Sequence, residues 1–123
     1  MAKVLVVDDD RVVLEMVKDL LEEAGHDVVS LSSPQLVATV IERERPSLML
    51  VDVNMPDVSG DAIVAFVKRF RRRYVQKIVL FSAAGEDRLR ALAAELGTDG
   101  YIKKGEVGEG LLAEIQRFLP PAP

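Results

Sequence analysis

The chain has 123 residues, enough for one domain with a single hydrophobic core. Its composition, 49% hydrophobic and 29% charged, is that of an ordinary globular protein. It contains no cysteine, which excludes disulfides and zinc–cysteine sites. A formal net charge of −4 argues against nucleic acid as a main partner, because such binding needs a basic face.

No apolar stretch of the chain approaches the ~20 residues that a membrane-spanning helix needs. The apolar run at the start of the chain, which ends at Val7, is too short for a signal peptide. We therefore expect a cytoplasmic protein that does not contact a membrane.

Five short apolar segments predict β-strands. They are rich in β-branched residues, and three of them are almost continuously apolar, as expected of parallel strands buried on both faces. The predicted strands span residues 3–7, 27–31, 47–53, 77–82 and 99–103.

Segments with helical spacing of apolar residues separate these strands. The first predicted helix follows an N-cap at Asp10 and ends at Gly25, a residue typical of helix C-termini. The second begins at Ser33, with Pro34 in the first helical position, and the third begins at Ser59.

The last two predicted helices also carry one apolar face each. The fourth ends at Gly97, and the fifth is ended by Pro120 and Pro121. The apolar faces comprise Leu89, Leu92, Ala93 and Leu96 in the fourth helix, and Val107, Leu111, Leu112, Ile115 and Leu119 in the fifth.

Strand and helix thus alternate five times, which predicts an α/β fold of (βα)5 type. The expected architecture is a doubly wound, five-stranded parallel sheet with right-handed crossovers and helices on both faces. We assign the domain to residues 1–119. Residues 120–123 are interpreted as a C-terminal tail or the start of a truncated linker.

Polar residues follow four of the predicted strands. In an open parallel α/β sheet, ligands bind at the carboxyl ends of the strands, so these side chains are expected to meet at one edge. They are Asp8, Asp9 and Asp10 after the first strand, Asp52 at the end of the third with Asn54 two positions on, Ser82 at the end of the fourth, and Lys103 and Lys104 at the end of the fifth.

Several carboxylates at one edge repel each other and favour a bound cation. Mg²⁺ suits them, because it takes hard oxygen ligands and is completed by waters and phosphate oxygens. A carboxylate can also attack phosphorus to form an aspartyl phosphate. A metal, a lysine and a hydroxyl then supply the charge neutralisation that phosphoryl transfer requires. The residues therefore predict a phosphoryl-acceptor site, with Asp52 as acceptor.

Four segments in this order resemble the response-regulator receiver domain of bacterial two-component signalling. They read VLVVDDD, LMLVDVNMPDVSG, IVLFSA and GYIKK, and the D-x-N-M-P-x-x-x-G run within the second is highly specific. The resemblance covers essentially the whole chain and implies the flavodoxin-like receiver architecture. It implies a regulatory phosphoacceptor rather than an enzyme, with slow self-dephosphorylation at most.

The resemblance also assigns the acceptor and the metal ligands. It implies that Asp52 accepts a phosphoryl group from the histidine of a sensor kinase or of a phosphotransfer protein. Asp8, Asp9 and Asp52 would hold Mg²⁺, together with the backbone carbonyl of Asn54. The downstream partner or effector domain is not specified by the sequence.

Three further residues match positions of the family that respond to the phosphoryl group. Ser82 would hydrogen-bond a phosphoryl oxygen, and Lys104 would pair with it electrostatically. Tyr101 matches the aromatic switch residue, which couples the site to the face formed by the fourth helix, fifth strand and fifth helix. The family usually places a cis proline after its lysine. Gly105 stands there in this chain, so we expect a trans peptide or a strained bond.

Two other functions are compatible with parts of the sequence. A haloacid-dehalogenase-like phosphatase would use Asp8 as nucleophile and Asp10 as acid/base, but would leave the segment around Asp52 unexplained. A receiver-like interaction module that is not phosphorylated is the second alternative, and Gly105 is the residue that favours it.

One basic segment is not explained by any of these functions. Residues 68–74 read KRFRRRY and are expected at the edge of the sheet opposite the acidic site. Our preferred interpretation is a solvated helix end whose cations complement the helix dipole. Docking of an acidic partner is the alternative.

Overall fold

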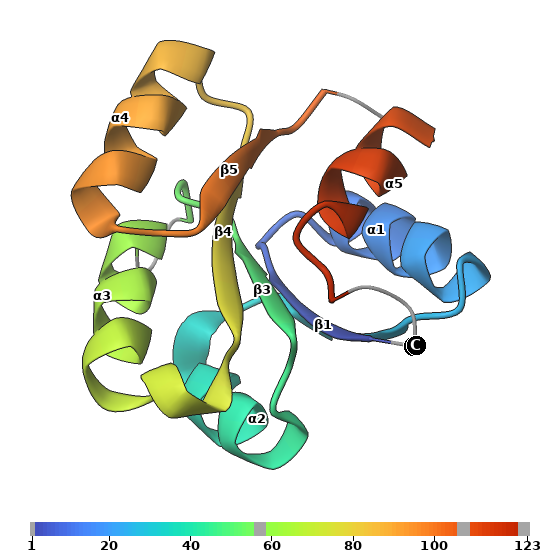
Figure 1. The fold of residues 1–123 in the computed structure, drawn as a ribbon, viewed down its shortest axis with the longest axis horizontal. Helices are drawn as coiled ribbons and strands as arrows, with labels where there is room; N and C mark the ends of the chain where they lie inside the picture. The colour runs from blue at the N-terminus through green and yellow to red at the C-terminus, as the bar shows by residue number, and fades with distance from the viewer. Residues whose placement is uncertain (1, 56–58, 106–108, 121–123) are drawn as a thin grey trace.

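The computed structural model describes residues 2–55, 59–105 and 109–120, and its five strands form one parallel sheet (Figure 1). The strand order is β2-β1-β3-β4-β5, which confirms the predicted doubly wound α/β fold. The strands are β1 (Lys3–Val7), β2 (Asp27–Leu31), β3 (Leu48–Val51), β4 (Lys77–Ser82) and β5 (Gly100–Lys103).

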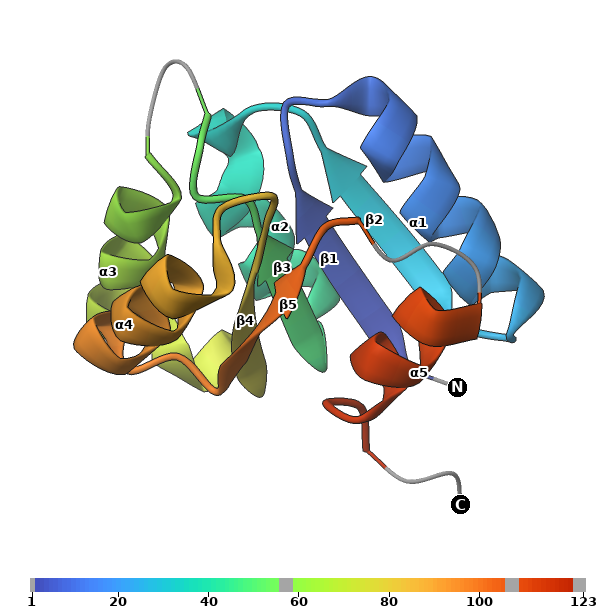
Figure 2. The same ribbon diagram turned by 90° about the horizontal axis from the view of Figure 1, so that it is seen from above.

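Helices cover both faces of the sheet, as Figures 1 and 2 show. One face carries α1 (Arg11–Glu23) and α5 (Glu109–Gln116), and the other carries α2 (Val37–Glu44), α3 (Gly60–Phe70) and α4 (Glu86–Leu96). Two short 3-10 turns, η1 (Pro34–Leu36) and η2 (Arg72–Tyr74), precede α2 and follow α3 respectively.

The central strands are buried on both faces, which explains their continuous apolar sequence. Successive side chains of a strand point to opposite faces. In β1, Val4 and Val6 accordingly pack with the α1 and α5 side, whereas Leu5 and Val7 pack with the α2, α3 and α4 side. The sheet therefore divides two hydrophobic cores, each closed by its own set of helices.

The predicted helix ends are largely confirmed. The Asp10 carboxylate caps α1 by accepting hydrogen bonds from the N–H groups of Val12 and Val13, at 3.0 and 3.3 Å. Gly25 follows α1, and Gly97 ends α4, both with the positive φ that glycine tolerates best.

Several boundaries differ from the prediction, and β3 and β5 each begin one residue later than expected, at Leu48 and Gly100. Pro34 opens the turn η1, and the α-helix itself begins only at Val37. β3 ends at Val51, so Asp52 already lies beyond the strand, and α5 ends at Gln116, although Leu119 remains buried. Val107 and the end of the proposed tail, residues 121–123, lie outside the described residues.

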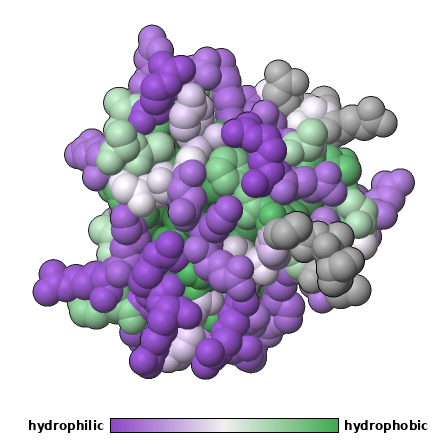
Figure 3. Space-filling model, viewed as in Figure 1, coloured by the Kyte–Doolittle hydropathy of each residue, from purple (hydrophilic) through white to green (hydrophobic). Residues whose placement is uncertain are grey.

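None of the helices in the described part of the chain is both long enough and apolar enough to cross a bilayer. In the space-filling view of Figure 3, hydrophilic side chains cover most of the visible face, with smaller apolar patches between them.

Gly60 brings the start of α3 directly against the chain that follows β3. Its N–H donates to the carbonyl of Val53 at 3.3 Å. A Cβ at this position would clash with the carbonyl oxygen of Asp52 and would lie 2.6 Å from Cα of Val53. Both are backbone atoms, so the neighbour cannot rotate away. The glycine that ends the D-x-N-M-P-x-x-x-G run is thus a packing requirement that holds Asp52 in place.

We predict that Gly60→Ala lowers the free energy of unfolding by about 1–3 kcal/mol, because overpacking forces the backbone to shift. The matched control is Gly85→Ala, since a Cβ there meets no atom within 4 Å. Urea denaturation followed by circular dichroism measures both variants. Equal stability of the two variants would contradict the packing requirement.

Candidate functional site

The predicted site residues follow neighbouring strands, and the sheet ladder continues beyond the strand ends to position them. The N–H of Asp52 donates to the carbonyl of Val7 at 2.9 Å, which sets Asp52 beside Asp8. The N–H of Lys104 donates to the carbonyl of Ser82 at 2.8 Å. Because β1, β3, β4 and β5 are consecutive in the sheet, all four residues gather at one edge.

Three carboxylates at this edge can share one cation. Asp8, Asp9 and Asp52 each offer a carboxylate oxygen, and these atoms lie within 4.8 Å of one another. Asp8 and Asp52 are buried, whereas Asp9 is exposed. A set of hard oxygen donors with one side open to solvent fits Mg²⁺, which keeps several waters when it binds to proteins.

The Asp8 carboxylate lies in the most demanding environment. Burial raises its pKa above the ordinary value, opposed by the neighbouring Lys104 ammonium and by the hydrogen bond that Asp8 Oδ1 accepts from the N–H of Asp10 at 2.9 Å. Asp8 Oδ2 lies 2.5 Å from Lys104 Nζ but accepts no well-directed hydrogen bond from the described residues. Keeping this group ionised therefore costs stability, and a bound cation would offset that cost.

Lys104 lies between the two buried carboxylates. Its Nζ is 3.3 Å from Asp52 Oδ2, in addition to its contact with Asp8, and its side chain is only 17% exposed. Lys103, by contrast, is exposed. The described residues contain no cis peptide bond, so the chain enters Gly105 through the trans path, and Gly105 has φ of 132°. The lysine thus reaches the carboxylates without the cis proline.

Asn54 links Asp52 to Ser82. Its N–H donates to Asp52 Oδ1 at 3.1 Å, and its side-chain amide approaches Ser82 Oγ at 3.5 Å. Ser82 is fully buried, and its Oγ also accepts a hydrogen bond from the N–H of Ala84 at 3.2 Å. The sequence predicted the backbone carbonyl of Asn54 as a metal ligand, but not this contact of its side chain with Ser82. The position of Asn54 two residues after Asp52 was the signal for this additional contact.

Tyr101 is half-buried at the junction of β5 and α4. Its hydroxyl donates to Glu86 Oε1 at 3.2 Å, and Nη2 of Arg90 lies 3.5 Å from the same oxygen. The tyrosine hydroxyl is therefore held at the surface of α4. No sequence pattern predicted the contact of Tyr101 with Glu86.

The fold and this arrangement agree with a comparison to known families. The profile described as the response regulator receiver domain matches residues 4–116. The chain belongs to this family. The receiver domain identity and the two-component context expected from the sequence are therefore confirmed, whereas the domain boundary at residue 119 stays a prediction.

Curated relatives of this receiver domain include transcription regulators. GltR of Pseudomonas aeruginosa is 30% identical over 116 residues, which cover 94% of this chain and 48% of GltR. CpxR of Escherichia coli is 31% identical over 119 residues, which cover 97% of this chain and 50% of CpxR. The receiver domain thus spans about half the length of these relatives.

Solved structures of receiver proteins have the same fold. The chemotaxis protein CheY4 of Vibrio cholerae superimposes with a TM-score of 0.87 at 28% identity, covering 97% of this chain and 99% of CheY4. The BeF3-activated receiver domain of DrrB gives a TM-score of 0.79 at 30% identity, with 96% and 97% coverage.

We predict that Mg²⁺ raises the melting temperature of this receiver domain by a few degrees, because a ligand of the folded state stabilises it. Asp9→Asn is expected to remove most of this shift without disturbing the core, since Asp9 is exposed. Thermal denaturation with Mg²⁺ or with EDTA provides the measurement.

Asp10→Asn is the matched control for this experiment. It removes one adjacent negative charge, but Asn caps helices as well as Asp does. The Asp10 variant should therefore keep the Mg²⁺ shift. Equal shifts in the wild type and both variants would show that Asp9 is not a ligand.

Proposed function

We propose that this receiver domain is a phosphoacceptor switch in which Asp52 takes a phosphoryl group from the histidine of a sensor kinase or of a phosphotransfer protein. The observation that carries the proposal is the position of the Asp52 carboxylate. It lies within reach of the Lys104 ammonium, 3.3 Å away, and within the cluster of carboxylate oxygens formed with Asp8 and Asp9. The fold itself does not require such a cluster, because a pair of apolar residues would stabilise this edge of the sheet better.

In the transfer, an Asp52 carboxylate oxygen forms a bond to phosphorus while the bond from phosphorus to the donor histidine nitrogen breaks. The phosphoryl oxygens bring negative charge to a site that already contains three carboxylates. Mg²⁺, when bound, supplies the main neutralisation of that charge. Asp8, Asp9, Asp52 and the backbone carbonyl of Asn54 would hold it.

The remaining site residues would orient and stabilise the transferred group. The ammonium of Lys104 can move from the carboxylates of Asp8 and Asp52 to a phosphoryl oxygen. This movement relieves its close contacts with the two carboxylates. Ser82 Oγ lies beside the Asn54 amide at 3.5 Å, so its hydroxyl is placed to donate to a phosphoryl oxygen. Transfer then depends on positioning and electrostatics, as phosphoryl transfer generally does.

The phosphoryl group would be read out at the face formed by α4, β5 and α5. Ser82 ends β4, next to β5, which carries Tyr101. A shift of Ser82 toward the phosphoryl group vacates space beside β5, and Tyr101 would turn inward, leaving Glu86. A local charge change would thus bias an existing two-state element.

The same proposal places the protein in the cytoplasm and assigns it a regulatory role rather than turnover of a substrate. We also propose slow hydrolysis of its own aspartyl phosphate. Asn54 and Ala84, each two positions past a site residue, would tune the rate of this hydrolysis. The family assignment gives no support to a haloacid-dehalogenase-like phosphatase. A receiver-like module that is not phosphorylated is the alternative that the next experiment tests.

We predict one phosphoryl adduct after incubation with Mg²⁺ and acetyl phosphate, measured by intact mass. The adduct should be absent with EDTA and absent in Asp52→Asn, because that variant lacks the nucleophilic oxygen. Asp61→Asn, which removes an acid on α3 outside the site, should keep the adduct. An adduct that survives in Asp52→Asn but is lost in Asp8→Asn would indicate the phosphatase chemistry. Absence of both an adduct and Mg²⁺ binding would favour the interaction module.

We also predict that Glu86→Gln raises the population of the inward orientation of Tyr101 a few-fold. The reason is that a neutral amide holds the tyrosine hydroxyl less strongly than a carboxylate does. The chain has two tyrosines and no tryptophan, so the fluorescence of Tyr74→Phe reports on Tyr101 alone. Quenching of the Tyr101 fluorescence by acrylamide should decrease upon phosphorylation. In Glu86→Gln, the quenching should already be lower without phosphorylation. Asp87→Asn is the control, and equal quenching in both variants would dismiss the role of Glu86.

A further inference from the structure

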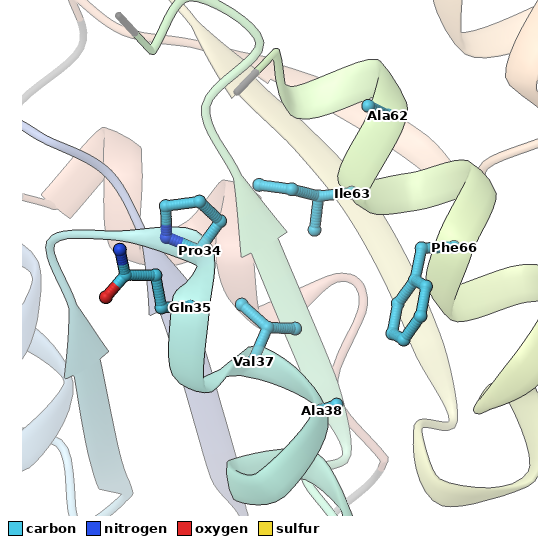
Figure 4. Close-up of a pocket in the computed structure, with 7 residues that line it drawn as sticks. All are labelled: Pro34, Gln35, Val37, Ala38, Ala62, Ile63 and Phe66. Carbon is cyan, nitrogen blue, oxygen red and sulfur yellow. The ribbon is translucent and has the colours of Figure 1, made fainter. Parts of the chain in front are cut away.

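A groove lies between the segment that contains η1 and α2 and the helix α3. Its volume is about 360 Å³. Pro34, Val37 and Ala38 line one side, and Ala62, Ile63 and Phe66 line the other, as Figure 4 shows. We call it the α2–α3 groove. Its lining is almost entirely apolar, and no residue of the phosphoacceptor site contributes to it.

Exposed apolar side chains concentrate on the elements that form this groove. Four large hydrophobic residues are exposed in the described part of the chain, and three of them belong to η1 or α3: Leu36 at 56%, Phe66 at 40% and Phe70 at 55%. The rings of Phe66 and Phe70 lie 5.4 Å apart, one turn from each other on α3. Exposed apolar side chains gathered beside an apolar groove are typical of an interaction site.

An ion pair joins the two helices that form the groove. Arg71 at the end of α3 contacts Glu42 of α2, with Nε and Oε1 2.6 Å apart. The Arg71 guanidinium also lies 5.8 Å from the centre of the Phe66 ring. The groove is thus formed before any partner binds, which lowers the ordering cost of association.

The structure divides the basic segment 68–74 into two groups of cations. Three of them serve the fold. Lys68 Nζ donates to the carbonyls of Leu96 and Gly97 at the end of α4, Arg72 donates to the carbonyl of Gln76 at 3.1 Å, and Arg71 pairs with Glu42.

The other two cations, Arg69 and Arg73, are exposed, and each lies beside the aromatic ring that follows it in the sequence. The Arg69 guanidinium lies 5.3 Å from the centre of the Phe70 ring, and that of Arg73 lies 4.9 Å from the Tyr74 ring. Both side chains are exposed, and neither forms a salt bridge with another described residue. The preferred interpretation of the segment as a mere solvated helix end is therefore incomplete.

We propose that the α2–α3 groove docks an acidic amphipathic helix of a partner protein. Apolar side chains at helical spacing would enter the groove beside Phe66, and flanking carboxylates would pair with Arg69 and Arg73. Charge complementarity selects an acidic partner. The recessed apolar lining selects a helix over a lipid bilayer or nucleic acid, because apolar side chains of a helix can enter it.

Docking at this groove does not use Asp52, and it therefore stands apart from the phosphoacceptor proposal. The probes are two fluorescein-labelled helical peptides with the same stripe of leucines at positions i, i+4 and i+7. One carries glutamates on the flanking positions and the other carries lysines. Fluorescence anisotropy measures the binding of each peptide to the full chain and to its Asp52→Asn variant.

Two pairs of variants separate the contribution of the apolar lining from that of the two cations. Ala62→Trp fills the groove, and Ala65→Trp, also exposed on α3 but outside the lining, is its control. Arg69→Glu with Arg73→Glu reverses the two cations, and Lys18→Glu with Arg88→Glu on α1 and α4 makes the same change of net charge elsewhere. Circular dichroism verifies that all variants fold.

We expect the acidic peptide to bind, and the Ala62→Trp and Arg69–Arg73 variants to weaken its binding about tenfold. The control variants and Asp52→Asn should bind as the wild type does. Three results would overturn the proposal: no binding of the acidic peptide, equal binding of both peptides, or equal losses in variants and controls. Binding of phosphatidylglycerol vesicles or duplex DNA that depends on Arg69 and Arg73, without peptide binding, would assign the surface to those anions instead.

Discussion

Two like charges are held together at the ends of neighbouring parallel strands, and much of this structure is arranged around them. Asp8 and Asp52 are both buried, and Lys104 reaches between them. Burial of a carboxylate is costly unless a cation and hydrogen bonds compensate it. One lysine cannot fully neutralise two buried carboxylates and the nearby Asp9. The site therefore favours positive charge, and in the proposed function a metal ion would offset the negative charge of the phosphoryl group.

The backbone around this charge cluster is correspondingly constrained. Asp52 is fixed from one side by the ladder bond to β1 and from the other by the direct contact of Gly60 with its carbonyl group. Lys104 is fixed by the ladder bond to Ser82. These constraints come from the hydrogen bonds of the sheet and from the close packing of the first turn of α3. A phosphoryl group would thus act on preorganised side chains, and the contact between Tyr101 and Glu86 at the surface is left as the adjustable part.

The α2–α3 groove has a different physical character from the acidic edge. The edge gathers buried charge, whereas the groove has an apolar lining, and the exposed Arg69 and Arg73 follow its Phe66 in the sequence. Most cations of the basic segment 68–74 contact other parts of the fold, as Lys68 does at the end of α4. Because Lys68 joins α3 to α4, the two helices lie in one connected layer, with the groove on one side and the proposed readout face on the other.

The sequence by itself determined the order of strands and helices and the gathering of Asp8, Asp52, Ser82 and Lys104 at one edge. Apolar periodicity and capping are local properties, and the carboxyl ends of parallel strands necessarily share an edge. The tertiary structure alone decided the start of α2 after a 3-10 turn, the contact of Tyr101 with Glu86, and the division of the basic segment. Those features depend on side chains from segments far apart in the chain, whose distances no local pattern encodes.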